Sequence, residues 1–247
     1  ISDHATPGGV LGQLKSIARE ALIESCKQMQ KAALELAIRG ADVPKTRKKG
    51  RVLTYKELVK MAEEKLGGPC EFSRRQKAFL KTLDSKMDMR EAAIRVSEWV
   101  LEESALQGPA IVLGFLPPYY PSRLNRNRES KERTLRHIIR DQARRGGELA
   151  GDGAVVVKKI FGGITDLSYL GFQGRKSGLS ALGENMPGWG ELYSLPMQEL
   201  LSLDIPVANM GPAGKDAHQS TERLELNYSL KVAPQLLIET IEKLSRK

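Results

Sequence analysis

The segment 211–219 places a histidine among acidic and amide side chains in a loop that glycine and proline interrupt. It follows a short apolar run at 205–208 that is typical of a buried strand, and α/β proteins often carry their chemistry in loops at strand ends. His218 is one of only three histidines in the chain. A neutral imidazole on a fixed loop is a good zinc donor when a carboxylate binds its second nitrogen. Asp216 and Glu222 are candidates for that second role.

The same side chains also have a structural interpretation. A lone histidine is more often a structural or surface residue than a ligand, because a zinc site needs several donors. Asp216 could cap the turn, and Glu222 could pair with Arg223. The loop by itself leaves both interpretations of His218 open.

A second loop broken by glycine lies at 162–166. Gly162 and Gly163 would let the backbone come close to a ligand or to a strand. Thr165 and Asp166 could contact a substrate, or they could anchor the loop by accepting backbone amides. Substrate binding and loop structure are therefore alternative roles for these residues.

Three apolar runs are predicted to be the strands that position these loops. They cover residues 110–116, 154–161 and 205–209. Because they alternate with helical patterns, we expect an α/β layer with mainly parallel strands. Each run ends in a glycine or proline cluster, at 117–121, 162–166 and 211–214. The ends of parallel strands share one edge of a sheet, so the clusters predict a site at that edge.

Helical patterns account for much of the rest. Thr6 and Pro7 predict the start of a helix that runs to about Arg39, because they provide an N-cap and a first-turn proline. Capping patterns predict two more starts, at Thr54 and at Asp88. Further helices are predicted at 72–83, 196–203 and 230–245, and a basic linker at 41–52. We expect residues 1–87 to form a helical segment with a linker, and residues 88–247 to form the α/β part.

The net charge of +9 comes largely from two arginine- and lysine-rich segments, 45–51 and 123–145. Only 5% of the residues are aromatic, and none interleaves with these segments as a base-stacking platform would. Nucleic-acid binding is therefore not expected, and a solvated basic surface is. Cys26 and Cys70 lack metal-ligand spacing and predict free thiols in a reducing compartment such as the cytoplasm. No apolar run is long enough to predict a membrane span.

Four strings together resemble the zinc-dependent superfamily of aminoacylases, acetylornithine deacetylases and carboxypeptidases, and within it the RocB-like arginine-utilisation proteins. They occur in family order at 117–121, 161–169, 185–190 and 209–223. The resemblance implies an enzyme with a two-zinc catalytic domain and an inserted lid domain that often dimerises. It implies that residues 88–247 are the C-terminal half of the catalytic domain. It also implies that residues 1–87 include the end of the lid domain.

The resemblance further implies roles for particular residues. His218 matches the last zinc ligand of the family, and the loop from Gly162 to Asp166 matches the substrate side. Some relatives carry an arginine just before the two glycines, where it can hold a substrate carboxylate. This chain has Phe161 there, which puts recognition of a substrate carboxylate in doubt.

The family's remaining zinc ligands and its catalytic glutamate have no match in this chain. Glu63-Glu64 and Glu102-Glu103 are adjacent glutamates, but they lie in helical patterns and are interpreted as solvated charges. Catalytic zinc normally takes three protein ligands and a water, so His218 alone cannot hold it. Together with a first residue other than Met, this predicts the C-terminal portion of a longer chain.

Two functions remain as hypotheses. The first is a zinc-dependent hydrolase of amide bonds in small peptides or acyl-amino acids, with arginine-related compounds among the candidate substrates. Its isolated 247-residue portion is expected to be inactive. Its partners would be the substrate and the missing N-terminal catalytic half. The second is a non-catalytic binding or regulatory module with a basic surface.

Overall fold

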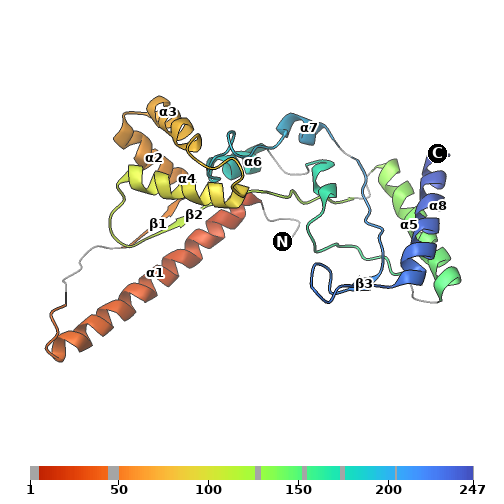
Figure 1. Ribbon diagram of the computed structural model, residues 1–247, viewed down its shortest axis with the longest axis horizontal. Coiled ribbons are helices and arrows are strands. Elements are labelled where there is room, and N and C mark those ends of the chain that lie inside the picture. Colours follow the sequence, from red (N-terminus) through yellow and green to blue (C-terminus); the bar gives the residue numbers. More distant parts are fainter. Residues whose placement is uncertain are drawn as a thin grey trace. The chain divides into compact units, whose positions relative to one another are not determined.

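The structure, a computed structural model, describes residues 6–43, 50–125, 129–151, 155–172, 176–203 and 205–246. The chain divides into two compact units, which are described separately (Figure 1). The first unit comprises residues 1–119 and 174–196, and the second comprises residues 120–173 and 197–247. The chain therefore leaves the first unit after Tyr119 and returns to it at Gly174.

Helices are the main regular structure of both units. The first unit contains α1 (Pro7–Ile38), β1 (Arg51–Thr54), α2 (Tyr55–Leu66), α3 (Pro69–Leu80), α4 (Met89–Ser104), β2 (Ala110–Leu113) and α6 (Lys176–Glu184). The second unit contains α5 (Ser130–Ala150), η1 (Asp166–Tyr169), α7 (Met197–Ser202), β3 (Gly214–Lys215), β4 (Arg223–Leu224), the π-helical turn η2 (Tyr228–Val232) and α8 (Ala233–Ser245). None of the described helices combines the length and apolarity needed to cross a membrane.

Local capping signals set three helix starts in the first unit as the sequence predicts. The Thr6 hydroxyl accepts the Gly9 amide at 3.1 Å, with Pro7 in the first turn of α1. Thr54 and Glu57 form the predicted capping box at the start of α2. The Asp88 carboxylate accepts the Arg90 amide at 2.9 Å at the start of α4. These predictions are confirmed because a cap depends only on residues within one turn.

β1 and β2 pair in parallel, with Arg51 opposite Ala110 and Thr54 opposite Leu113. The connection between them runs through α2, α3 and α4 (Figure 1). β2 confirms the first part of the strand predicted at 110–116. The basic linker predicted as far as residue 52 is wrong at its end, because β1 begins at Arg51. A strand of four residues is too short to show a clear alternation in the sequence.

The core of the first unit lies between α2 and α4. It contains six buried residues, Tyr55, Leu58, Ala62, Phe72, Val96 and Val100. The Trp99 ring lies beside this core, with its centroid 5.4 Å from that of Phe72 and 5.6 Å from that of Phe79. α3 is thus attached to α4 mainly through aromatic contacts.

The Tyr55 hydroxyl is buried in this core and has no hydrogen-bond partner among the described residues. Burial also raises the pKa of the Tyr55 phenol above its usual range. An unsatisfied buried hydroxyl opposes folding, so Tyr55→Phe should leave the free energy of unfolding unchanged or raise it by about 1 kcal/mol. Denaturant titration followed by tryptophan fluorescence measures this change. A loss of stability beyond about 1 kcal/mol would show that the hydroxyl is bonded in the folded protein.

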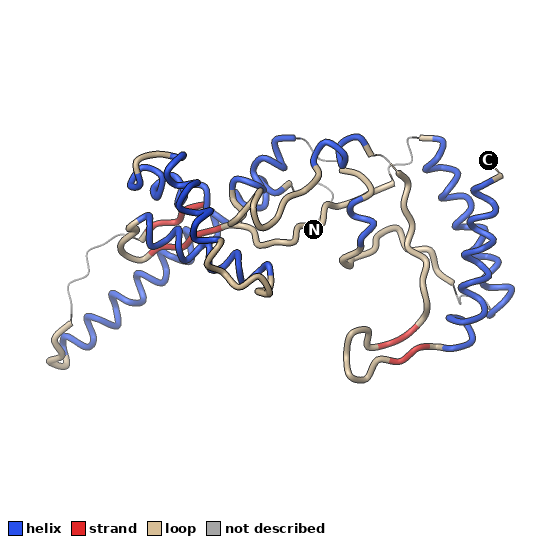
Figure 2. The backbone as a smooth tube through the Cα atoms, turned by 45° about the horizontal axis from the view of Figure 1, so that its top comes forward, coloured by secondary structure: helices blue, strands red, loops and turns tan. Residues whose placement is uncertain are grey.

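In the second unit, α5 packs against α8, and the two helices lie side by side in both Figure 1 and Figure 2. Gly146 permits this contact, because a Cβ there would lie 3.2 Å from Leu236 and would collide with Val155. The Gln142 side chain is fully buried in the same interface. Its amide is satisfied when the nitrogen faces Glu239 at 3.3 Å and the oxygen faces Lys243 at 2.9 Å.

Two of the three predicted strands are wrong within the described residues, because 155–161 and 205–209 are irregular. The backbone of 205–207 is instead bound by side chains. The Arg123 guanidinium donates to the Ile205 carbonyl at 2.6 Å, and the Asn125 side chain accepts the Val207 amide at 2.9 Å while donating to its carbonyl. A strand forms only where a second backbone offers a ladder. The α/β catalytic-domain fold stays a prediction.

The boundary predicted at residues 87–88 lies within the first unit, between α3 and α4. The assignment of residues 1–87 to the end of a lid domain also stays a prediction. Most of the basic segment at 45–51 lies outside the described residues, as do Arg126 and Arg128 of the second basic segment. Much of the remainder of that second segment forms α5.

Candidate functional site

His218 lies in the loop of a short hairpin that β3 and β4 form. Gly214 is opposite Leu224, and Lys215 is opposite Arg223. Gly214 is required there, because a Cβ would lie 2.5 Å from the Arg223 carbonyl oxygen. Asp216 and His218 both have left-handed backbone, with φ of 57° and 64°. Non-glycine residues held in this region cluster at functional sites, so the observation favours a functional loop without identifying its function.

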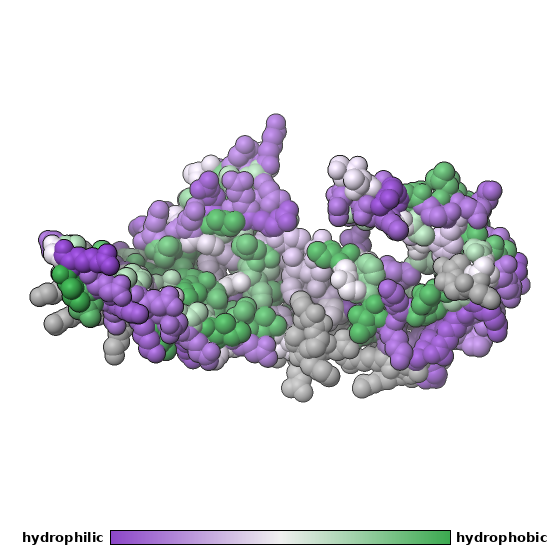
Figure 3. Space-filling view, turned by 90° about the horizontal axis from the view of Figure 1, so that it is seen from below, coloured by the Kyte–Doolittle hydropathy of each residue, from purple (hydrophilic) through white to green (hydrophobic). Residues whose placement is uncertain are grey.

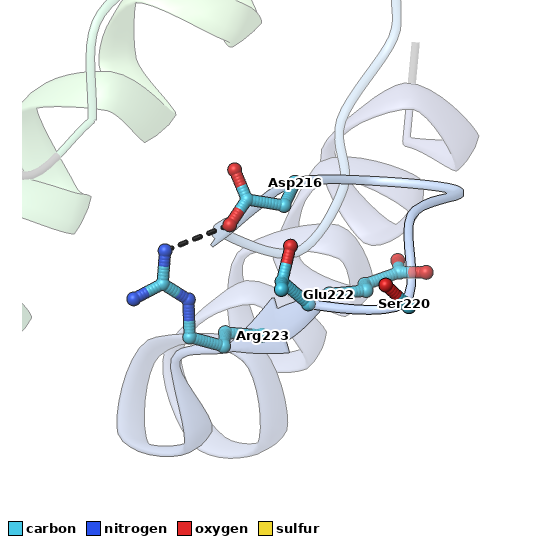
Figure 4. Close-up of a pocket in the computed structure, with 5 residues that line it drawn as sticks. Asp216, Ser220, Glu222 and Arg223 are labelled. Carbon is cyan, nitrogen blue, oxygen red and sulfur yellow. Dashed lines mark hydrogen bonds and ion pairs between the residues drawn. The ribbon is translucent and has the colours of Figure 1, made fainter.

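The acidic residues of the loop bind other partners than the His218 ring. The Arg223 guanidinium pairs with the Asp216 carboxylate at 2.8 Å (Figure 4). The Glu222 carboxylate accepts the backbone amide of His218 at 3.2 Å. Neither the expected carboxylate–imidazole contact nor the alternative pair of Glu222 with Arg223 is present among the described side chains. The side-chain pairing follows from strand register, because Arg223 lies opposite Lys215 and therefore beside Asp216.

The His218 side chain is exposed, and its imidazole makes no hydrogen bond to the described part of the chain. The same hairpin also carries an open hollow of about 480 Å³, lined by Asp216, Ser220, Thr221, Glu222 and Arg223 (Figure 4). Among the described residues, no group of three or more histidine, cysteine, aspartate or glutamate side chains could hold a metal ion. His218 can therefore offer one nitrogen donor, and a zinc site would need further ligands.

The base of the hairpin is attached to the start of the C-terminal helix. The Ser229 hydroxyl accepts the Ala213 amide at 3.1 Å and donates to the Ala213 carbonyl at 3.2 Å. The Glu225 amide also donates to the Ala213 carbonyl, at 2.9 Å. The Glu225 side chain accepts the amides of Asn227 and Tyr228 and so caps the turn η2. These bonds fix the position of the His218 loop relative to α8.

In the glycine loop at 162–166, Thr165 has the anchoring role. Its hydroxyl accepts the Leu167 amide at 3.4 Å and caps η1. Asp166 is exposed at the first position of η1, so the anchoring role considered for it belongs to Thr165. A Cβ at Gly163 would lie 2.7 Å from the Phe161 ring, whereas one at Gly162 would meet nothing within 4 Å. Gly163 therefore accommodates a neighbouring side chain, and Gly162 lies beside open space.

The strings at 117–121 and 185–190 contain aromatic residues that make packing contacts. In the first unit, the Tyr193 hydroxyl accepts the Tyr119 amide at 3.1 Å and donates to the Tyr119 carbonyl at 3.0 Å. The Trp189 ring packs over Gly183 and edge-on against Tyr193, with centroids 5.8 Å apart. Burial, with the Tyr193 phenol adding to it, raises the pKa of Tyr119.

In the second unit, the Tyr120 ring lies 5.5 Å from that of Tyr169, which ends η1. Each of the two tyrosines after the prolines therefore contacts another tyrosine, Tyr119 through its backbone and Tyr120 through its ring.

Sequence reasoning missed the role of Asn185, which joins three elements of the first unit. It is 4% exposed, and its side-chain oxygen accepts the Lys56 amide in the first turn of α2 at 3.0 Å. Its side-chain nitrogen donates to the Ala181 carbonyl of α6 at 2.8 Å. Its backbone carbonyl accepts the Phe115 amide at 2.8 Å, just after β2. A buried amide side chain needs such partners, and the sequence alone does not show them.

Other candidate residues lie where solvated charges were expected. Glu63-Glu64 and Glu102-Glu103 lie on α2 and α4 as predicted. His137 is exposed on α5, with its Nε2 3.3 Å from an Asp141 oxygen. Cys26 and Cys70 are free thiols. His4 lies outside the described residues.

Two proteins of Bacillus subtilis (strain 168) are similar to this chain. The chain is 32% identical to Protein RocB over 134 residues, which are 54% of this chain and 24% of RocB. The chain is related to RocB. It is also 33% identical to the uncharacterized protein YqjN over 197 residues, 78% of this chain and 34% of YqjN. No family model and no solved structure matches it.

The four strings indicated a resemblance to RocB-like proteins, and the similarity to RocB confirms that part of the resemblance. The chain spans about a quarter of RocB and about a third of YqjN, so most of each relative's length lies beyond the matched region.

Proposed function

We propose that this chain is part of a zinc-dependent hydrolase that cleaves amide bonds in small peptides or acyl-amino acids. The observation that carries the proposal is the His218 loop. It resembles the superfamily loop that carries the last zinc ligand, and it presents an exposed imidazole from a hairpin fixed to α8. The relation to RocB supports the proposal, because the resemblance of the four strings to the superfamily includes its RocB-like arginine-utilisation proteins.

Within such an enzyme, His218 would donate one ring nitrogen to zinc. Bound zinc would supply a Lewis acid and a water of lowered pKa. Glu222 would hold the backbone at His218 through its 3.2 Å bond to the amide, and Arg223 would hold Asp216. The other ligands and the general base would come from residues outside this chain. For that reason we expect the isolated chain to be inactive.

The glycine loop would lie on the substrate side. Thr165 caps η1, and this leaves the exposed carboxylate of Asp166 available to a cationic group of the substrate. Phe161 is exposed just before the two glycines and offers no charge to a substrate carboxylate. A cationic acyl-amino acid or peptide, such as an arginine derivative, therefore suits the loop better than a substrate with an anionic side chain.

Hydrolysis by the complete protein tests this proposal. N-acyl-arginine, N-acyl-glutamate and a set of dipeptides would be assayed before and after treatment with a zinc chelator. We expect hydrolysis of at least one arginine derivative, its loss on chelation, and its return when zinc is added. Hydrolysis that persists at full rate after the metal has been removed would contradict a zinc-dependent mechanism.

A further inference from the structure

The C-terminal helix and the turn before it carry a row of large apolar side chains that the described chain leaves exposed. These residues recur at helical spacing and are exposed by 64%, 46%, 57%, 58% and 39%, respectively: Leu230, Leu237, Ile238, Ile241 and Leu244. Figure 3 shows hydrophobic surface (green) on the unit that contains α5 and α8. Contiguous exposed apolar surface of this kind marks an interaction site more often than a free surface.

The neighbouring face of α8 is already occupied. Leu236 and Thr240 are buried, at 0% and 6% exposure. Glu239 and Lys243 bind the buried Gln142 amide of α5. Because α5 is held by these contacts, it cannot also cover the exposed row. A second element must cover it if it is covered at all.

An extended segment of the same unit also exposes apolar side chains. Val156, Ile160 and Phe161 are exposed by 69%, 72% and 61%, respectively, in a segment that forms no strand within the described residues. Val155, at its start, contacts Gly146 of α5. A helix with an apolar face buries that face against another element, and a helix packed on a sheet is one of the few stable arrangements.

We propose that the exposed face of α8 is the docking surface for a β-sheet contributed by the part of the complete protein that lies outside this chain. The inference rests on the proposed function, which requires that part for the remaining zinc ligands. The relatives support this occupant over a second copy of the chain, because about two thirds or more of each lies beyond the matched region. Since Ser229 ties the hairpin to the start of the helix, docking on α8 would also determine where His218 meets its fellow ligands.

Thiol labelling tests whether this face is covered. Ile241→Cys and, separately, Ile238→Cys would be introduced into the 247-residue chain and into the complete protein, with Cys26→Ala and Cys70→Ser in both backgrounds. Arg136→Cys on α5 is the matched control, because Arg136 is also exposed on a helix of the same unit. The rate of reaction with a water-soluble thiol reagent is measured for each protein.

We expect the thiols introduced at positions 238 and 241 to react at least about tenfold more slowly in the complete protein than in the isolated chain. The control thiol at position 136 should react equally in both. Equal rates at 238 and 241 in the two proteins would overturn the proposal. Protection that already exists in the isolated chain and rises with its concentration would assign the face to a second copy and would also overturn it.

The labelling rates do not depend on metal or on turnover. Slow labelling in a complete protein without zinc would therefore refute the proposed function and keep the docking surface. Fast labelling in an active zinc enzyme would refute the docking surface alone.

Discussion

His218→Ala in the complete protein should lower the rate of amide hydrolysis by more than about 100-fold. Losing only a residue that hydrogen-bonds to a metal ligand costs up to about that factor, and losing the ligand itself should cost more. The variant should also lose bound zinc. Removing the ring takes away a nitrogen donor that nothing else in the hairpin can replace, because Asp216 is paired with Arg223 and Glu222 with a backbone amide. Elemental analysis and initial rates measure the two effects.

His137→Ala is the matched control for this experiment. His137 is also an exposed histidine of the second unit, but its described ion-pair partner is Asp141 on its own helix α5. We expect its zinc content and its rates to equal those of the unaltered protein. If both histidine variants behave alike, His218 is a surface residue and the zinc-ligand assignment is wrong.

Asn185→Ala should lower the free energy of unfolding of the first unit by roughly 3 kcal/mol. The change leaves the Lys56 amide and the Ala181 carbonyl without their partner at a nearly buried position, and each unsatisfied group costs about 1–3 kcal/mol. Asn185→Asp keeps an acceptor for the Lys56 amide at a helix N-terminus, so its loss should be smaller.

Tryptophan fluorescence reports this change selectively. The two tryptophans of the chain, Trp99 and Trp189, both belong to the first unit. A denaturant titration therefore follows that unit without requiring both units to unfold together.

Glu184→Gln provides the control for Asn185→Ala in the adjacent residue. It removes only the ion pair of Glu184 with Lys56, whose side chains are 44% and 59% exposed. Exposed pairs of this kind contribute about 1 kcal/mol or less. If Asn185→Ala costs no more than Glu184→Gln, the Asn185 side chain does not join α2 to α6 as the structure indicates.

The helices were largely predictable, whereas the strands were not. Thr6, Thr54 and Asp88 each bind an amide two or three positions ahead, so the sequence contains both partners of the bond. The runs at 155–161 and 205–209 have the composition of strands but no backbone ladder among the described residues. In the second run, Arg123 and Asn125 take the place of a ladder. Each of these two residues lies 82 positions from the residue that it binds, so the neighbouring sequence does not predict the contact.

Within the candidate site, the sequence predicted a special loop but not its internal contacts. Glycine and proline marked the loop, and the structure adds left-handed backbone at Asp216 and His218. The partners of Asp216 and Glu222 depend on hairpin register, which places Arg223 beside Asp216. Thr165 and Asp166 are neighbours with similar capping ability, and only the backbone at η1 decides that Thr165 accepts the Leu167 amide.

The zinc content of the complete protein tests the central claim most directly. The protein would be purified without added metal, dialysed, and analysed for zinc beside the 247-residue chain treated in the same way. We expect zinc in stoichiometric amount in the complete protein and none retained by the isolated chain, because His218 alone cannot hold the ion. A folded complete protein that contains no zinc and takes up none on titration would contradict the claim.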